Sequence, residues 1–267
     1  MELSIGKAWE ETGAFLAREA RLVAPVALAL FALPSIVLNW AYPAGETGAA
    51  GGGAMLALLA LFIAIVIGQM TVALLAIGWR GSIGQAIGKV TRRLPAFLGA
   101  ALITFGPVML LLLIVLAMLL AGAGIKDPAT LTPEALAKIP GVGWAMFAML
   151  LVLLFLSVRL FPLSAVVANE TAGPIGLIKR SWALTKGHFG RLLAVLLLLL
   201  VAALVLSSAV AIVVGSIVTL VLGEPRPFNL AALLIALGGG IVGALISSVY
   251  SAMIGRIYVQ LSGDGAI

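Results

Sequence analysis

The sequence has no cysteine, a single histidine and few charged residues. Without cysteine it forms no disulfide, thiolate metal site or cysteine nucleophile. One histidine, His188, rules out a site built on two histidines, and no acid pair near it has the spacing of metal ligands. Neither a G-x-x-x-x-G-K-[ST] phosphate loop nor a G-x-S-x-G nucleophile elbow occurs. These absences predict a protein that is not an enzyme and that uses no cofactor.

Apolar residues dominate instead. They make up 63% of the chain against 10% charged residues, and the mean hydropathy is +1.25. Six runs are continuously apolar, at about 22–41, 53–79, 95–121, 142–168, 189–221 and 230–258. A helix rising about 1.5 Å per residue crosses a hydrocarbon layer of about 30 Å in about 20 residues. Because the runs do not alternate every second residue, helices are favoured over a barrel. The sequence predicts an all-α integral membrane protein with six transmembrane helices.

A short amphipathic segment precedes each pair of apolar runs. The three segments open on the same dipeptide, at Ile5-Gly6, Ile83-Gly84 and Ile175-Gly176. Recurrence at this spacing is typical of an internal repeat. We therefore expect one membrane domain, 1–267, with repeat units 1–81, 82–173 and 174–267. Each unit is predicted to be an interfacial amphipathic helix followed by a transmembrane hairpin.

The basic residues are unevenly divided between the two sides of the predicted spans. One side has only Lys126, Lys138 and Arg226. The other side has twelve, called the basic collar here: Lys7, Arg18, Arg21, Arg80, Lys89, Arg92, Arg93, Lys179, Arg180, Lys186, Arg191 and Arg256. The positive-inside rule then predicts a bacterial-type inner (plasma) membrane protein with both termini in the cytoplasm.

Two interpretations of the basic collar are open. Its cations can serve only to fix topology, or they can recognise anionic lipid headgroups or a cytoplasmic partner. The second segment has four cations and no acid, which makes it the best candidate for recognition; the cations are Arg80, Lys89, Arg92 and Arg93. The distribution of charge does not indicate nucleic-acid binding.

A few polar residues lie within the predicted spans. Arg159 is the only ionisable group well inside one, near the midplane, with Glu170 eleven residues on and nearly on the same helix face. It either binds neighbouring carbonyls as a packing residue or binds an anionic group. Gln69 in the second span and a group in the sixth occupy comparable places in their units, which predicts that the even-numbered spans converge on a polar centre. The sixth-span group is Ser247, Ser248, Tyr250 and Ser251.

The sixth span also has small residues at every fourth position. They are Gly239, Gly243, Ser247, Ser251 and Gly255. Such a face lets another helix approach closely. The second helix belongs either to the same chain or to a second copy in a homodimer.

One stretch carries a family resemblance. From Gly173 the chain reads Gly-Pro-Ile-Gly-Leu-Ile-Lys-Arg-Ser-Trp-Ala-Leu-Thr-Lys-Gly-His-Phe-Gly-Arg, which includes Arg180, Ser181, Trp182, Lys186 and Arg191. This resembles the signature of the glycerophosphoryl diester phosphodiesterase membrane-domain family, Arg-Ser-Trp-x-Leu-Thr-Lys/Arg-Gly-x-Phe-x-Arg before an apolar helix. Arg159 and Glu170 stand where that pattern has an arginine and an acid, whereas Gly190 replaces a second aromatic.

The resemblance implies a multi-span helical membrane protein. The hydrolase domain that gives the family its name has no counterpart in this sequence, so no phosphodiesterase activity is implied. Within the stretch, Trp182 suits the membrane interface, and Lys179, Arg180, Lys186 and Arg191 suit phosphate contact.

The leading hypothesis is a non-enzymatic membrane-organising or accessory protein whose basic collar binds anionic lipid. The alternative is a small transporter or channel for a lipid or amphiphilic anion, with Arg159 in a central cavity. A third hypothesis is a subunit that assembles with itself or another membrane protein through the small-residue face of the sixth span.

Overall fold

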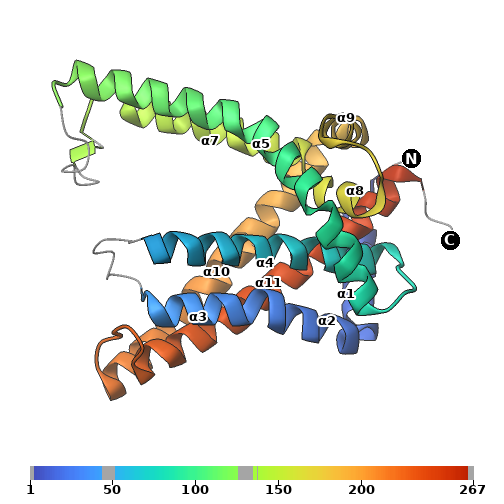
Figure 1. The fold of residues 1–267 in the computed structure, drawn as a ribbon, viewed down its shortest axis with the longest axis horizontal. Helices are drawn as coiled ribbons and strands as arrows, with labels where there is room; N and C mark the ends of the chain where they lie inside the picture. Colours follow the sequence, from blue (N-terminus) through green and yellow to red (C-terminus); the bar gives the residue numbers. More distant parts are fainter. Residues whose placement is uncertain (1–2, 44–51, 126–134, 137, 264–267) are drawn as a thin grey trace.

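The computed structural model describes residues 3–43, 52–125, 135–136 and 138–263, and within these ranges the regular structure is entirely helical (Figure 1). Six segments are long and apolar enough to cross a membrane. They are Ala20–Ala41, Met55–Ile77, Ile83–Gly122, Val142–Asn169, Phe189–Leu222 and Leu230–Ser262. The prediction of a multi-pass all-α membrane protein is confirmed.

The region predicted as the first repeat unit, 1–81, contains α1 (Ile5–Arg18), a composite first span and α4 (Gly52–Ile77). The first span is built from α2 (Ala20–Ala27), the π-helical turn η1 (Leu28–Ala32) and α3 (Leu33–Ala41). Within η1 the Leu33 N–H donates to Leu28 O, five residues back, just before Pro34. Proline has no N–H to donate, and a helix tolerates it best in its first turn. Because α3 begins directly after the π turn, Pro34 lies in the first turn of α3.

The second amphipathic segment is not a separate helix, which corrects its prediction as a short helix of its own. It forms the beginning of α5, a single helix of 40 residues (Ile83–Gly122) that starts in a capping box between Ser82 and Gln85. Figure 1 shows the beginning of α5 running at an angle to the rest. After the third amphipathic segment, Gly187 (φ +85°) lies in the turn that separates the short helix from the span. After the second segment the chain has Pro95 inside the continuous helix. A proline inside a helix bends it without requiring a loop.

The fourth span is interrupted, which corrects its prediction as one helix over 142–168. Helix α7 (Val142–Arg159) ends in a turn, and α8 (Leu163–Asn169) follows. Pro162 has no N–H to donate to Val158 O, which instead accepts from Phe161 N–H at 3.3 Å. The chain re-enters a helix when Leu163 N–H donates to Leu160 O at 2.9 Å. The break therefore begins directly after Arg159.

The rest of the described chain forms α9 (Pro174–Thr185), α10 (Phe189–Leu222) and α11 (Leu230–Ser262). Helix α11 is central and packs against α1, α3, α4, α8 and α10. A Cβ on Gly255 would lie 2.7 Å from Ala73 O and 2.8 Å from the Ala76 Cβ, so α4 and α11 cross at van der Waals contact there. A Cβ on Gly239 or Gly243 would have no heavy atom within 4 Å.

The small-residue face of α11 is thus used within the chain only towards its C-terminal end. Ser251, which is fully buried, and Gly255 belong to the packed face. Towards the N-terminal end of α11, the buried residues are instead Ala236, Gly240 and Ala244. Gly240 and Ala244 each follow directly after a small residue of the predicted face, Gly239 or Gly243. A strict four-residue spacing drifts around a helix of 3.6 residues per turn, so one partner helix cannot follow it for five turns.

The second, fourth and sixth spans meet through α4, α8 and α11, but on an apolar core. Helices α4, α8 and α11 pack on one another through residues such as Met70, Val167 and Ile254, all at most 2% exposed. In the described residues the expected polar centre is not formed. The Ser248 hydroxyl donates to Ala244 O and the Ser251 hydroxyl to Ser247 O, each within its own helix. Gln69 is half-buried on α4.

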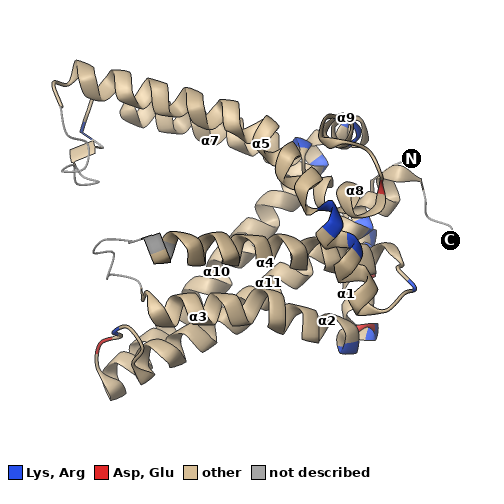
Figure 2. Ribbon diagram, in the orientation of Figure 1, with Lys and Arg blue, Asp and Glu red and all other residues tan. Residues whose placement is uncertain are grey.

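Lysine and arginine gather at the end of the bundle where both termini lie (Figures 1 and 2). That end contains α1, α8, α9 and the beginning of α5 (Figure 1). Lys138 lies in the connection between α5 and α7, and Arg226 lies in the connection between α10 and α11, at the far ends of these spans from the beginning of α5 and from α9. Lys126 lies outside the described residues. The sorting of charge along the sequence therefore corresponds to a sorting in space.

Candidate functional site

The break after Arg159 places this residue against α9 and the beginning of α10. The guanidinium carbon lies 5.5 Å from the ring centroids of Phe155 and Trp182 and 5.6 Å from that of Phe189. Phe155 also contacts Trp182 edge-on, with centroids 6.0 Å apart, and Phe189 at 5.6 Å. A cation within about 6 Å of a ring centroid is attracted by the ring quadrupole. We call Arg159 with Phe155, Trp182 and Phe189 the aromatic cluster.

Two hydroxyl groups of α9 hold the backbone of Arg159. In a continuous helix Arg159 O would accept from Leu163 N–H, but that donor is bound to Leu160 O. Ser181 Oγ donates to Arg159 O at 3.0 Å, and Thr185 Oγ1 contacts it at 3.4 Å. Both residues are fully buried. The Ser-x-x-x-Thr spacing in the family-like stretch thus places two donors, one helical turn apart, at the carbonyl that the break frees.

Ser181→Ala is expected to lower the free energy of unfolding by about 1 kcal/mol, because Arg159 O keeps only its longer contact with Thr185. The measurement is unfolding of the purified protein in mixed micelles. Ser207→Ala is the matched control, since Ser207 is exposed on α10. Equal stability of both variants with the unaltered chain would show that this hydrogen bond contributes nothing.

The Arg159 guanidinium has no acceptor in the part of the chain that the structure describes. Its Nε is buried and makes no hydrogen bond, and no carboxylate pairs with it there. Phe155 and Trp182 are each 39% exposed, so the aromatic cluster borders the outside of the bundle. The rings hold the cation in place while leaving its hydrogen-bonding capacity unused, as a site for an external anion requires.

Glu170 lies apart from this cluster. Its Oε1 accepts from Arg180 Nε at 2.9 Å and from the Tyr258 hydroxyl at 3.0 Å, and Asn169 Nδ2 donates to that hydroxyl at 3.2 Å. The shared face predicted for Arg159 and Glu170 is corrected, because it assumed an unbroken helix. Glu170 instead ties the end of α8 to α9 and α11.

The other predicted site residues are spread over the basic end. Lys89 lies 5.0 Å from the Trp79 ring centroid, and Arg92 is exposed on α5 near the half-buried Arg93. Lys186 is exposed at the end of α9. Arg191 donates from Nη1 to Leu3 O at 2.8 Å, which ties α10 to the N-terminal segment. They border the bundle end and do not form one pocket with Arg159.

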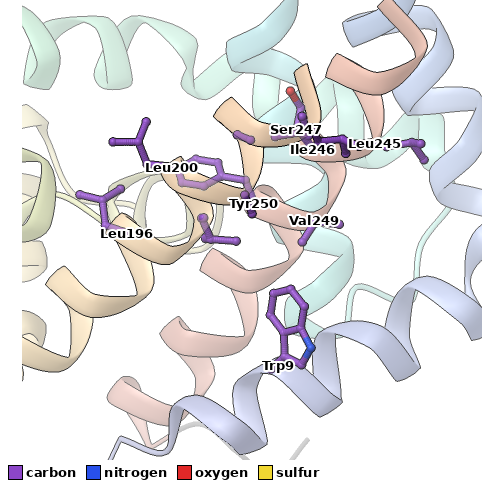
Figure 3. Close-up of a pocket in the computed structure, with 12 residues that line it drawn as sticks. Trp9, Leu196, Leu200, Leu245, Ile246, Ser247, Val249 and Tyr250 are labelled. Carbon is purple, nitrogen blue, oxygen red and sulfur yellow. The ribbon is translucent and has the colours of Figure 1, made fainter. Parts of the chain in front are cut away.

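A separate pocket of about 420 Å³ lies between α10 and α11 (Figure 3). It contains two predicted candidates, Ser247 and Tyr250, and Arg159 does not line it. Figure 3 shows Trp9 rising from α1 toward the side chains of the other two helices. The candidates predicted to share one centre are thus divided between a cationic cluster and an apolar pocket.

Sequence reasoning missed Phe155, Phe189 and Tyr258. Phe155 is four residues before Arg159, the spacing at which two side chains share a helix face. The sequence therefore contained a pattern that could have predicted this contact. Phe189 stands inside the family-like stretch but had no assigned partner. Tyr258 had no local signal, because its partners are contributed by α8.

No curated protein and no solved structure matches this chain. The resemblance of the stretch after Gly173 to the glycerophosphoryl diester phosphodiesterase membrane-domain family stays a prediction. A family model described as a domain of unknown function (DUF7847) matches residues 3–261, which is nearly the whole chain. The six spans, the basic end and the aromatic cluster around Arg159 therefore lie within the matched region, and the chain belongs to the DUF7847 family.

Proposed function

We propose that this chain is a non-enzymatic inner-membrane protein that binds anionic lipid at its basic end and acts as a membrane-organising or accessory protein. The observation that carries the proposal is the Arg159 guanidinium. It is stacked on three aromatic rings at the outer surface of the bundle and has no acceptor among the described residues.

The surroundings of Arg159 suit a lipid phosphate. Trp182 and Phe155 are partly exposed apolar rings that can lie against acyl chains. Lys179 is on the same short helix as Ser181 and Trp182, which contact Arg159, and Lys186 directly follows that helix. Each lysine or arginine near an anionic leaflet adds about 1 kcal/mol of attraction. Several such residues at one end of the bundle favour anionic over zwitterionic lipid.

The finer architecture belongs to the same proposal. In it, α1, α9 and the beginning of α5 lie in the cytoplasmic interface as parts of three related units, and both termini are cytoplasmic. The clustering of lysine and arginine at that end supports this orientation through the positive-inside rule (Figure 2).

The test compares lipid retention in native mass spectrometry, with equal amounts of phosphatidylglycerol and phosphatidylcholine supplied to the purified protein. We expect the unaltered chain to retain phosphatidylglycerol preferentially. Arg159→Gln, which removes the charge, is expected to reduce that preference about fivefold, the equivalent of about 1 kcal/mol for one cation. Arg226→Gln at the opposite end is the matched control and should keep the preference.

Thermal unfolding of the same samples separates binding from packing. If Arg159→Gln unfolds more readily but keeps its lipid preference, Arg159 is a packing residue and the proposed headgroup site is wrong. If the unaltered chain retains both lipids equally, the proposal as a whole fails.

A further inference from the structure

The pocket between α10 and α11 is apolar along almost its entire lining. Helix α10 contributes Leu196, Leu199, Leu200, Ala202, Ala203 and Leu206. Helix α11 contributes Leu245, Ile246 and Val249 beside Ser247 and Tyr250, and Trp9 of α1 completes the lining. Both α10 and α11 are candidate membrane spans, and Leu200, Leu206 and Leu245 are 44–59% exposed. In a membrane the pocket is therefore a groove that opens sideways to lipid.

Three polar groups line this groove without a hydrogen-bonding partner in the described chain: the Trp9 indole N–H, the Ser247 hydroxyl and the Tyr250 hydroxyl. Neighbouring hydroxyls behave differently, since Ser248 and Ser251 both donate to carbonyls of α11. A polar group facing hydrocarbon without a partner is costly. An occupant that brings acceptor oxygens, such as the ester groups of a phospholipid, would satisfy them.

The length of the groove matches one leaflet. From Leu196 to Leu206 the helix rises about 15 Å, which is half of the hydrocarbon thickness of about 30 Å. An acyl chain extends through that depth. A helix of a second copy that spans the membrane would require about twice the length.

The charge at one end fits a phosphate. Arg191 precedes Leu196 by five residues on α10, about 7.5 Å along the helix axis. On α1, Lys7 pairs with Glu11 at 3.8 Å, so Arg191 is the cation offered to a headgroup here. The contact between Arg191 and Leu3 O brings the beginning of α10 close to the N-terminal segment that precedes Trp9. The groove thus has a cation and an indole at the end where a headgroup would lie and leucines beyond it.

We infer that the groove binds one acyl chain of a membrane phospholipid, with its ester oxygens near Trp9 and Tyr250 and its phosphate near Arg191. This inference goes beyond the proposed function, because it concerns a groove for an acyl chain that Arg159 does not line, and zwitterionic as well as anionic phospholipids have the phosphate and ester groups that it would hold.

The experiment uses the full chain in phosphatidylcholine vesicles that contain a phosphatidylcholine with a photoreactive diazirine on its acyl chain. Labelled peptides are identified by mass spectrometry after illumination. We expect labels to concentrate on the groove residues of α10 and α11. Ala203→Phe, which fills the groove, should reduce that labelling at least fivefold. Ala209→Phe, the same change at an exposed position of α10 outside the groove, should leave it unchanged.

Labels spread evenly over the exposed residues of α10, such as Leu198 and Val201, would overturn the inference, as would equal labelling of the two variants. The absence of lipid label from the groove, with label elsewhere on α10, would likewise overturn it. If Ala203→Phe does not fold, the distribution of labels over α10 and α11 of the unaltered chain still tests the inference. The zwitterionic probe makes failure here distinguishable from failure of the anionic preference.

Discussion

Gly255→Ala is expected to lower the free energy of unfolding by about 1–3 kcal/mol, as overpacking in a filled core does. The new Cβ would lie 2.7 Å from Ala73 O and 2.8 Å from the Ala76 Cβ. The first of these is a backbone atom, so no side-chain rotation relieves the contact and α4 and α11 have to move apart. The measurement is reversible unfolding in mixed micelles.

Gly243→Ala on the same helix is the matched control. Its Cβ would have no heavy atom within 4 Å, and alanine is better than glycine inside a helix by about 1 kcal/mol. We therefore expect its stability to be unchanged or raised. If both variants lose stability equally, close packing does not explain Gly255.

The predicted homodimer through Gly239 and Gly243 stays a prediction, and size measurement of Gly243→Leu tests it.

Tyr258→Phe is expected to lower the free energy of unfolding by about 1.5–3 kcal/mol, the range for a hydrogen bond to a charged group. The Tyr258 side chain is 1% exposed, and its hydroxyl donates to Glu170 and accepts from Asn169. Phenylalanine fills the same space, but Glu170 and Asn169 then lose their hydrogen bonds to the hydroxyl. The connection of α8 to α11 should therefore loosen.

Tyr250→Phe two turns earlier is the control. Its hydroxyl makes no hydrogen bond in the described part of the chain, so no loss is expected in lipid-free detergent. Chemical unfolding followed by tryptophan fluorescence measures both variants. A Tyr258→Phe protein as stable as the unaltered chain would mean that the Glu170 carboxylate is held by Arg180 alone.

Much of the fold was predictable because lipid imposes simple rules on sequence. Apolar length alone located all six spans, since a helix must cover the hydrocarbon layer with apolar side chains. The order of charged residues separated the two ends of the bundle, with Lys138 and Arg226 away from the rest. The third short helix was also predictable, because Pro174 suits its first turn and Gly187 its end.

The candidate site was predictable only in part. Arg159 stood out because a charge within an apolar run is costly, and the family-like stretch identified Ser181 and Trp182. That these residues meet was not visible in the sequence. Their contact depends on α7 ending at Arg159, and a proline such as Pro162 is equally compatible with a bend in a continuous helix.

The sequence by itself determined what each segment is: six apolar helices, a basic end and three amphipathic segments, because hydropathy and charge act on each residue separately. Only the tertiary structure decided which residues meet. The rotation of α11 assigned Gly255 to the packed face and left Gly243 open. The break in the fourth span separated Arg159 from Glu170 and gave each residue different partners. Such pairings depend on the angle and rotation of whole helices, to which distant residues contribute jointly, and no local pattern of residues records them.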